Sequence, residues 1–213
     1  MRYLVRLANS RDYTPRDVKM LQAKIRELLG SGDKIGNLRI STSAIEFDLF
    51  AEQTDLNRSK SLLEAKMSKV VTFRSLESRV SIGGKQEALR EAIDLFNQER
   101  YWEAHEVLEE IWHPATGVER DIIQGLILTA AALVHYQKNE KAVCLSILGR
   151  AMEKLGALDN FKGLDIKRLR AGIEQIQKDN TPKLLRIEWV KTKTHAQPRE
   201  GICTLLAEEF KPN

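Results

Sequence analysis

The sequence predicts an α+β protein, in which a ferredoxin-like βαββαβ domain is followed by an all-α helical bundle. Two observations support this fold class. Strand-like and helix-like hydrophobic periods alternate over the first eighty residues, whereas only the helical period recurs from about residue 84 to 180. A chain of 213 residues is long enough for two modest domains, each with its own core. We therefore expect a ferredoxin-like α/β sandwich at 1–80, a helical bundle at 81–180, and a basic C-terminal tail at 181–213.

The first strand and helix have clear sequence signals. "YLVRLA" is typical of a strand, and Thr14 followed by Pro15 is a typical helix start. The helix that follows has apolar residues at helical spacing, namely Val18, Leu21, Ile25, Leu28 and Leu29. Gly30 and Gly32 end it.

Two further strands, "NLRISTS" and "AIEFDLFA", are joined too tightly for a crossover connection, so they predict an antiparallel hairpin. A second helix over about 57–68 and a closing strand "KVVTFRSL" complete the order β-α-β-β-α-β. This order is that of a ferredoxin-like sandwich, with two helices on one face of a four-stranded sheet.

Ferredoxin-like domains that bind RNA expose aromatic side chains on their central strands. Here Phe47 and Phe73 alternate with charged residues, so we expect both rings in the core under the helices. Glu46 and Asp48 are then expected on the opposite, solvent-facing side of the sheet. Two carboxylates on that face would repel phosphates, so binding to nucleic acid is not expected.

The second half predicts helices at roughly 84–98, 101–113, 118–138, 140–156 and 165–179, separated by breaks at "PATG", "KNEK" and "DNFKG". Short connections favour antiparallel neighbours and hence a compact bundle. "SRVSIGGKQ" is typical of a linker between the two domains.

One helix of the bundle, "HEVLEEIW", carries polar residues on an apolar stripe. His105, Glu109 and Trp112 share that stripe with Leu108, and Ala104 and Ile111 indicate that it faces inward. The other acidic residues of this helix are expected on its solvated side, namely Glu103, Glu106 and Glu110. Because a buried carboxylate needs a partner or a proton, His105 and Glu109 mark a polar site.

The next helix offers possible partners for that site. Gln124, Leu128, Ala131 and His135 recur at offsets of four, three and four, while Gly125 and several alanines permit close helix packing. Gln124 or His135 would face His105 if the two helices pack antiparallel. Which of them does so depends on a register that the sequence leaves open.

"LFNQERYWEAHEVLEEIW", followed by "IIQGLILTAAALVHYQKNEKA", resembles the helical family called domain of unknown function 309. The resemblance covers about residues 85–158. The matching positions are Phe96, Asn97, Tyr101, Glu103, Ala104, His105, Glu106, Glu109, Trp112, Gln124, Gly125 and His135. It implies a small α-helical bundle without an established activity, so it supports the fold and the site while leaving the reaction open.

The leading functional hypothesis is a site for a small ligand or a divalent metal ion. His105, Glu109 and His135 are candidate metal ligands, since imidazole and carboxylate groups bind first-row metals. Without a metal, His105 and Glu109 are candidate catalytic residues, with His105 as a general base held by the carboxylate. Tyr101, Trp112, Gln124 and His135 are candidate ligand-binding residues around them.

The alternative is a non-catalytic interaction or assembly module in which the His–Glu pair only fixes helix register. Core packing is then the role of Tyr101, Trp102 and Trp112. The charge distribution fits either contact between segments or partner binding, with net charges of +5 over 1–80, −5 over 81–160 and +4 over 161–213. "LLRIEWVK" alternates like an edge strand that could extend the first sheet, and homo-oligomerisation stays open.

The remaining features predict a cytoplasmic protein without membrane spans. The longest apolar run, "LILTAA" continuing to Val134, is shorter than the ~20 residues of a membrane helix. The N-terminus lacks the apolar core and cleavage site of a secretory signal. Cys144 and Cys203 lie far apart and outside any metal-type spacing, as expected of reduced thiols.

Overall fold

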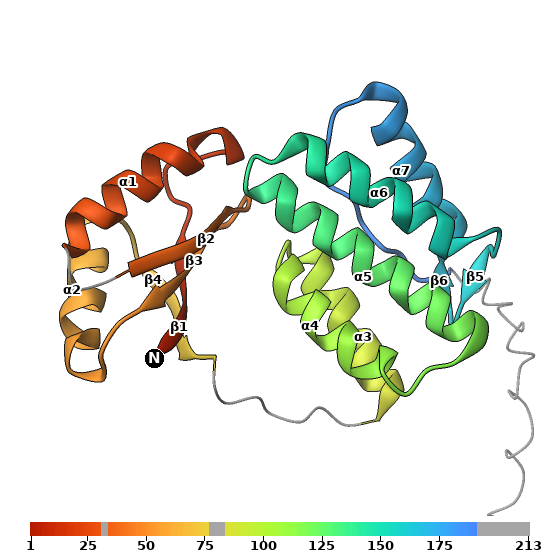
Figure 1. Ribbon diagram of the computed structural model, residues 1–213, viewed down its shortest axis with the longest axis horizontal. Coiled ribbons are helices and arrows are strands. Elements are labelled where there is room, and N and C mark those ends of the chain that lie inside the picture. Colours follow the sequence, from red (N-terminus) through yellow and green to blue (C-terminus); the bar gives the residue numbers. More distant parts are fainter. Residues whose placement is uncertain (31–33, 77–83, 191–213) are drawn as a thin grey trace, which may run out of the picture.

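The computed structural model describes residues 1–30, 34–76 and 84–190, which form an α/β sheet unit and a helical unit side by side (Figure 1). The predicted α+β fold class is confirmed. No helix within these described ranges is both long and apolar enough to cross a lipid bilayer.

The N-terminal unit is built on four strands, β1 (Arg2–Ala8), β2 (Lys34–Ile40), β3 (Ala44–Phe50) and β4 (Val70–Ser75). The strand order is β2-β3-β1-β4, and every neighbouring pair is antiparallel, as in the predicted βαββαβ arrangement. Helices α1 (Val18–Leu29) and α2 (Leu56–Lys66) cover one face of this sheet (Figure 1). A 3-10 turn precedes each helix, at Pro15–Asp17 and Gln53–Asp55.

The core of this unit lies between the sheet and the two helices. It contains the alternate residues of the central strands together with the inner stripe of α1, including Val5, Leu7, Leu21, Ile25, Phe47 and Leu49. Phe47 is fully buried and Phe73 is half-buried against this cluster. Both rings therefore belong to the core, as the alternation predicts, where burying one large apolar side chain contributes roughly 1.5–3 kcal/mol.

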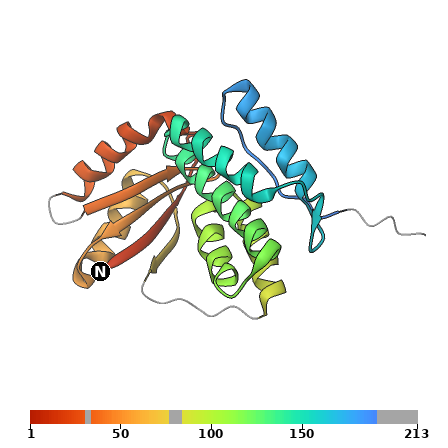
Figure 2. The ribbon, with the colours of Figure 1, turned by 45° about the vertical axis from the view of Figure 1, so that its right-hand side comes forward.

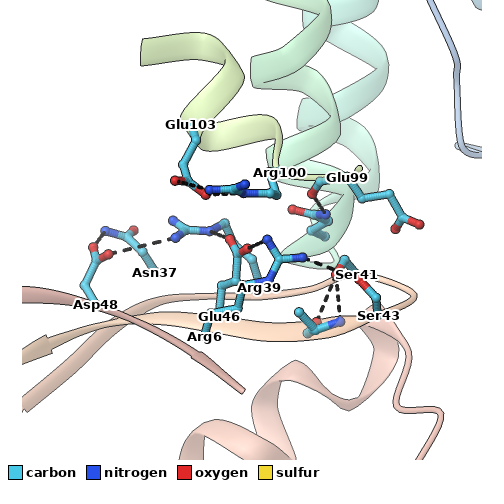
Figure 3. Close-up of polar contacts among 12 residues, drawn as sticks. Arg6, Asn37, Arg39, Ser41, Ser43, Glu46, Asp48, Glu99, Arg100 and Glu103 are labelled. Atoms are coloured by element: carbon cyan, nitrogen blue, oxygen red, sulfur yellow. Dashed lines mark hydrogen bonds and ion pairs between the residues drawn. The ribbon is translucent and has the colours of Figure 1, made fainter. Parts of the chain in front are cut away.

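The second face of the sheet differs from the prediction. Glu46 and Asp48 were expected to face solvent, but their exposed fractions are 3% and 0%. The start of the helical unit covers the central part of this face, around Glu46 and Asp48, as Figure 3 shows, while Arg2 and Arg74 at its margin stay partly exposed. The alternation in this strand correctly assigned Phe47 to one face of the sheet and Glu46 and Asp48 to the other. The expectation that the two carboxylates face solvent is wrong.

The C-terminal unit contains α3 (Lys85–Asn97), α4 (Tyr101–Trp112), α5 (Gly117–Gln137), α6 (Lys141–Leu155) and α7 (Ile166–Asp179). Figures 1 and 2, which differ by a rotation of 45°, show α4 packed on one side of α5 and α6 on the other. Helix α3 packs beside α4, and α7 packs beside α6. Gly125 permits the close approach of α5 to α6, since an added Cβ would stand 2.7 Å from Leu155 Cδ2. Gly125 on α5 was predicted to permit close helix packing, and it does so at the contact with α6.

A short hairpin formed by β5 (Asn160–Phe161) and β6 (Leu164–Asp165) was not predicted. Its two turn residues, Lys162 and Gly163, have φ angles of 48° and 88°, as type I′ turns require. The "DNFKG" segment is therefore a tight hairpin rather than a plain interhelical break.

The segment after α7 packs on the helical bundle. Leu185 and Ile187 are buried in its hydrophobic cluster, and the Asn97 amide hydrogen-bonds both the carbonyl and the N–H of Ile187, at 2.9 and 3.0 Å. The expectation that "LLRIEWVK" extends the first sheet is therefore wrong. The Asn97 side-chain amide pairs with the backbone of this segment, and Trp189 forms an isolated antiparallel β-bridge with Leu164. The rest of the predicted tail, 191–213, lies outside the described residues, as does the predicted linker at 77–83.

Candidate functional site

Helix α4 places the predicted polar stripe at the edge of the bundle core. Ala104 and Leu108 are fully buried on its inner side, whereas the His105 side chain keeps an exposed fraction of 24%. Successive residues of a helix are about one hundred degrees apart, so His105 lies beside the buried stripe of Ala104 and Leu108 rather than at its centre. His105 is therefore partly buried, as predicted, and remains accessible from outside.

Three side chains of α4 converge at this boundary, and we call His105, Glu106 and Glu109 the His105 group. Their possible ligand atoms all lie within 4.8 Å of one another. His105 Nδ1 is 3.6 Å from Glu106 Oε1, and His105 Nε2 is 3.8 Å from Glu109 Oε1. Both distances exceed those of a hydrogen bond, and the buried Nδ1 atom has no hydrogen-bond partner. The group is therefore assembled without being closed by hydrogen bonds between its members.

The electrostatics of the group leave the imidazole neutral. Burial lowers the pKa of His105 below its ordinary value of 6.5, and the nearby Glu109 carboxylate opposes that shift only in part. A neutral imidazole keeps a lone pair on one ring nitrogen, so the group offers one nitrogen and two carboxylates as donors.

His135 and Gln124, the other predicted members of the site, lie on α5. His135 Nδ1 pairs with Glu140 Oε2 at the start of α6, and Lys138 Nζ is 3.8 Å from the second Glu140 oxygen. Within the described part of the chain, neither His135 nor Gln124 forms a hydrogen bond with His105. The structure therefore contains two separate His–Glu pairs rather than one combined cluster.

Trp112 and Tyr101 have packing roles. The Arg120 guanidinium carbon lies 3.7 Å from the centroid of the Trp112 ring, and Arg120 donates to the carbonyls of Trp112, His113 and Ala115. This stack closes the C-terminal end of α4. Tyr101 is fully buried edge-to-face against Phe96, and burial raises the pKa of its hydroxyl far above the usual range. Both aromatic rings thus help to hold the helix that carries the His105 group.

A second polar cluster, which no sequence motif predicted, lies where the sheet meets α4. We call it the interface cluster; it consists of Arg2, Arg6, Asn37, Arg39, Glu46, Asp48, Arg74, Arg100 and Glu103. Figure 3 shows its central part, without Arg2 and Arg74. Glu103, expected on the solvated side of α4, has an exposed fraction of only 7%. That expectation is wrong because the sheet covers the first turn of this helix.

On the helix side of this cluster, Glu103 is the central acceptor. Arg100 Nε and Nη2 each donate to its carboxylate at 2.8 Å, and Arg74 Nη2 donates across from β4 at 2.8 Å. Burial acts to raise the pKa of Glu103, but the hydrogen bonds and charges of the two arginines outweigh it and hold the pKa below the usual range.

On the sheet side, Asp48 accepts hydrogen bonds from Arg2 Nη2 at 2.7 Å and from Asn37 Nδ2 at 2.6 Å. Glu46 lies between two arginines, 3.2 Å from Arg6 Nη1 and 3.6 Å from Arg39 Nε. Burial raises the pKa of Glu46 despite those neighbours, because its contacts are longer and leave Oε1 without a hydrogen bond.

The sequence held one indirect signal of this interface, the net charge of +5 over 1–80 next to −5 over 81–160. Contact between segments was one reading of that pattern, and the Arg74–Glu103 pair is such a contact. Which arginine meets which carboxylate could not be predicted, because it depends on how the two units are placed.

These features define a mixed α+β chain in which an antiparallel sheet is joined to a helical bundle that carries a half-buried His–Glu–Glu group. Residues 89–146, from α3 into α6, match the family described as Domain of unknown function (DUF309), which confirms the resemblance seen in the sequence motifs.

An uncharacterised protein of Aquifex aeolicus (strain VF5) is 28% identical over 108 residues, which cover 50% of this chain and 32% of that relative. The matched part of this chain thus spans about a third of the relative's length. No solved structure matches the chain.

Proposed function

We propose that the His105 group binds a divalent metal ion of the first transition row. The observation that carries this proposal is the convergence of one imidazole nitrogen and two carboxylates within 4.8 Å on the half-buried edge of a single helix. Nitrogen and oxygen donors of this kind suit Zn²⁺ and its first-row neighbours.

The spacing within the group supports a shared ion better than a structural hydrogen bond. Two ligands about 2.1 Å from one tetrahedral ion stand about 3.4 Å apart. The separations of 3.6 Å at His105 Nδ1 and 3.8 Å at His105 Nε2 are each close to that value and too long for direct hydrogen bonds, and one ion would take one of these two nitrogens together with the carboxylates. A purely structural His–Glu pair would be expected to close to hydrogen-bond distance, as His135 and Glu140 do.

Three protein ligands leave coordination positions for water or a small ligand, which is the arrangement of metal sites that take part in reactions. With His105 and Glu109 as metal ligands, the bound ion would polarise such a ligand. His135 does not belong to this proposed site, since it is paired with Glu140 beside the Lys138 ammonium group.

The test is a calorimetric titration of the chelator-treated full chain with Zn²⁺ and, separately, Mn²⁺. We expect binding of about one ion per chain, lost in His105→Ala and weakened in Glu106→Gln and Glu109→Gln. The matched control is His135→Ala, which removes the other paired histidine and should bind the ion like the unchanged protein. Circular dichroism checks that each variant is folded. Equal binding by His105→Ala and the unchanged protein would rule out the proposed site.

A further inference from the structure

Part of the contact between the two units is polar and is carried by the short turn that leads into α4, beside further contacts between α5 and β2. Glu99 Oε2 accepts a hydrogen bond from the Thr42 N–H at 2.9 Å, and Glu103 accepts from Arg74 at 2.8 Å. Between them, the Trp102 ring lies 5.4 Å from the Arg39 guanidinium carbon. The start of α4 thus contacts the sheet through two carboxylates four residues apart, Glu99 and Glu103, and through the Trp102 ring.

The sheet face complements such an acidic turn. It carries four arginines, Arg2, Arg6, Arg39 and Arg74, against the two carboxylates of Glu46 and Asp48. Arg74 and Arg39 contact the start of α4 directly, through Glu103 and Trp102, and Figure 3 shows Arg6 and Arg39 on the sheet beneath this helix start. The recognition is therefore electrostatic, with Trp102 adding a cation–π contact.

The two units can separate at this contact, because no shared hydrophobic cluster joins them and several polar atoms are buried there without a hydrogen bond. Each unit has its own hydrophobic cluster, and the two clusters share no residue. At the contact, several buried atoms lack a hydrogen-bond partner, namely Arg39 Nε and Nη2, Glu46 Oε1 and Asp48 Oδ1. Removing such groups from water costs free energy that ion pairs at 3.2–4.0 Å offset only in part. Polar contacts between units of one chain commonly allow relative movement.

The acidic turn is held in shape by the bundle rather than by the sheet. Gln137 Nε2 on α5 donates to the Glu99 carbonyl at 2.8 Å, and Arg100 holds Glu103 from within the same helix. The turn would therefore keep its form after separation, and the sheet face would be left open.

From these contacts we infer that the arginine-bearing face of the N-terminal sheet is a docking surface for an acidic helix start of the Glu-x-x-Trp-Glu kind. In this chain the start of α4 occupies the surface, and the same surface accepts a matching acidic helix of a partner protein when α4 leaves it. This inference does not depend on metal binding by the His105 group.

The first experiment measures separation in the full chain. Spin labels are attached at Lys60→Cys on α2 and Arg150→Cys on α6, two exposed positions, with Cys203→Ser preventing labelling of the tail and Cys144 protected by burial. We expect one narrow distance distribution, and a broader one with a longer component in Glu99→Gln/Glu103→Gln. The charge-matched control, Glu119→Gln/Asp159→Asn, removes two carboxylates of exposed pairs and should leave the distribution narrow.

The second experiment measures recognition, with a labelled peptide of residues 97–112 (NQERYWEAHEVLEEIW) as the probe. A hydrocarbon link between positions 104 and 108, on the side that faces the bundle in the protein, holds the peptide helical, and circular dichroism checks this before binding is measured. Fluorescence anisotropy should show saturable binding to the Glu99→Gln/Glu103→Gln protein and weaker binding to the unchanged protein, in which α4 competes. A peptide with both glutamates changed to glutamine should bind at least about tenfold more weakly, because charged hydrogen bonds are stronger than neutral ones. An unchanged distance distribution in the double variant, absence of peptide binding, or equal binding of the two peptides would each overturn the inference.

Discussion

Helix α4 carries two groups of charged side chains that differ in how their charges are compensated. Glu103, in its first turn, has an exposed fraction of 7% and receives two arginines at 2.8 Å. One turn further on, the carboxylates of Glu106 and Glu109 keep 22% and 42% of their surface exposed and face an imidazole that burial keeps neutral.

The difference separates a structural cluster from a candidate binding site. In the interface cluster, negative charge is matched by guanidinium groups of the same chain, so it can hold units together without a ligand. In the His105 group, the two carboxylates lie 3.6 and 3.8 Å from the nitrogens of a neutral imidazole, and such nitrogen and oxygen atoms can serve as ligands of a cation.

The largest expected effect lies in the interface cluster. Asp48→Ala removes the acceptor of Arg2 and Asn37 and leaves Arg39 buried with less negative charge nearby. Breaking a buried ion pair by removing one partner typically lowers the free energy of unfolding by ~3–5 kcal/mol. Chemical denaturation followed by circular dichroism measures this loss. A loss below about 1 kcal/mol, the size seen at exposed pairs, would mean that solvent compensates Asp48 and that the cluster is not tightly closed.

A smaller effect is expected at the His105 group, as a dependence of stability on pH in chelator-treated protein. Because burial lowers the pKa of folded His105 below 6.5, the unfolded chain takes up this proton more readily. The contribution to stability is therefore complete above pH 6.5 and is lost as the pH falls through the lowered pKa. His105→Gln should remove this part of the pH dependence. A proton NMR titration gives the midpoint directly, and a midpoint above 6.5 would contradict the assignment.

The smallest effect is expected for an ion pair on the bundle surface. Glu119 pairs with Lys162, both side chains are about one-third exposed, and the Lys162 hydrogen bond lowers the pKa of Glu119. Glu119→Gln should change the free energy of unfolding by less than about 1 kcal/mol, with the difference shrinking further in high salt. The same denaturation measurement, made at low and high salt, tests this. A loss as large as that of Asp48→Ala would show that burial is not what separates the two sites.

Much of the fold could be predicted because its signals are local. The helix over 101–113 was expected from apolar residues at helical spacing and is observed as α4, Tyr101–Trp112. The strand "AIEFDLFA" was expected from alternation and is observed as β3, Ala44–Phe50. The β5–β6 hairpin was missed because its strands have two residues each, which is too short for a period to be recognised.

The candidate site was predictable only where one helix supplies it. His105 and Glu109 are four apart, so the helical repeat itself brings them together. Glu106 was assigned to the solvated side, yet it joins the group because a side chain at the edge of a stripe can turn toward either side. His135 depended on the register between two helices, and the structure pairs it with Glu140.

The sequence by itself determined the class of each unit, the succession of strands and helices in the first, and the spacing of His105 and Glu109, because these follow from backbone periods and residue types within short segments. Only the tertiary structure decided that Glu46, Asp48 and Glu103 are buried together. A repeat of two or 3.6 residues assigns a side chain to a face, but whether that face meets water or arginines depends on residues from distant parts of the chain.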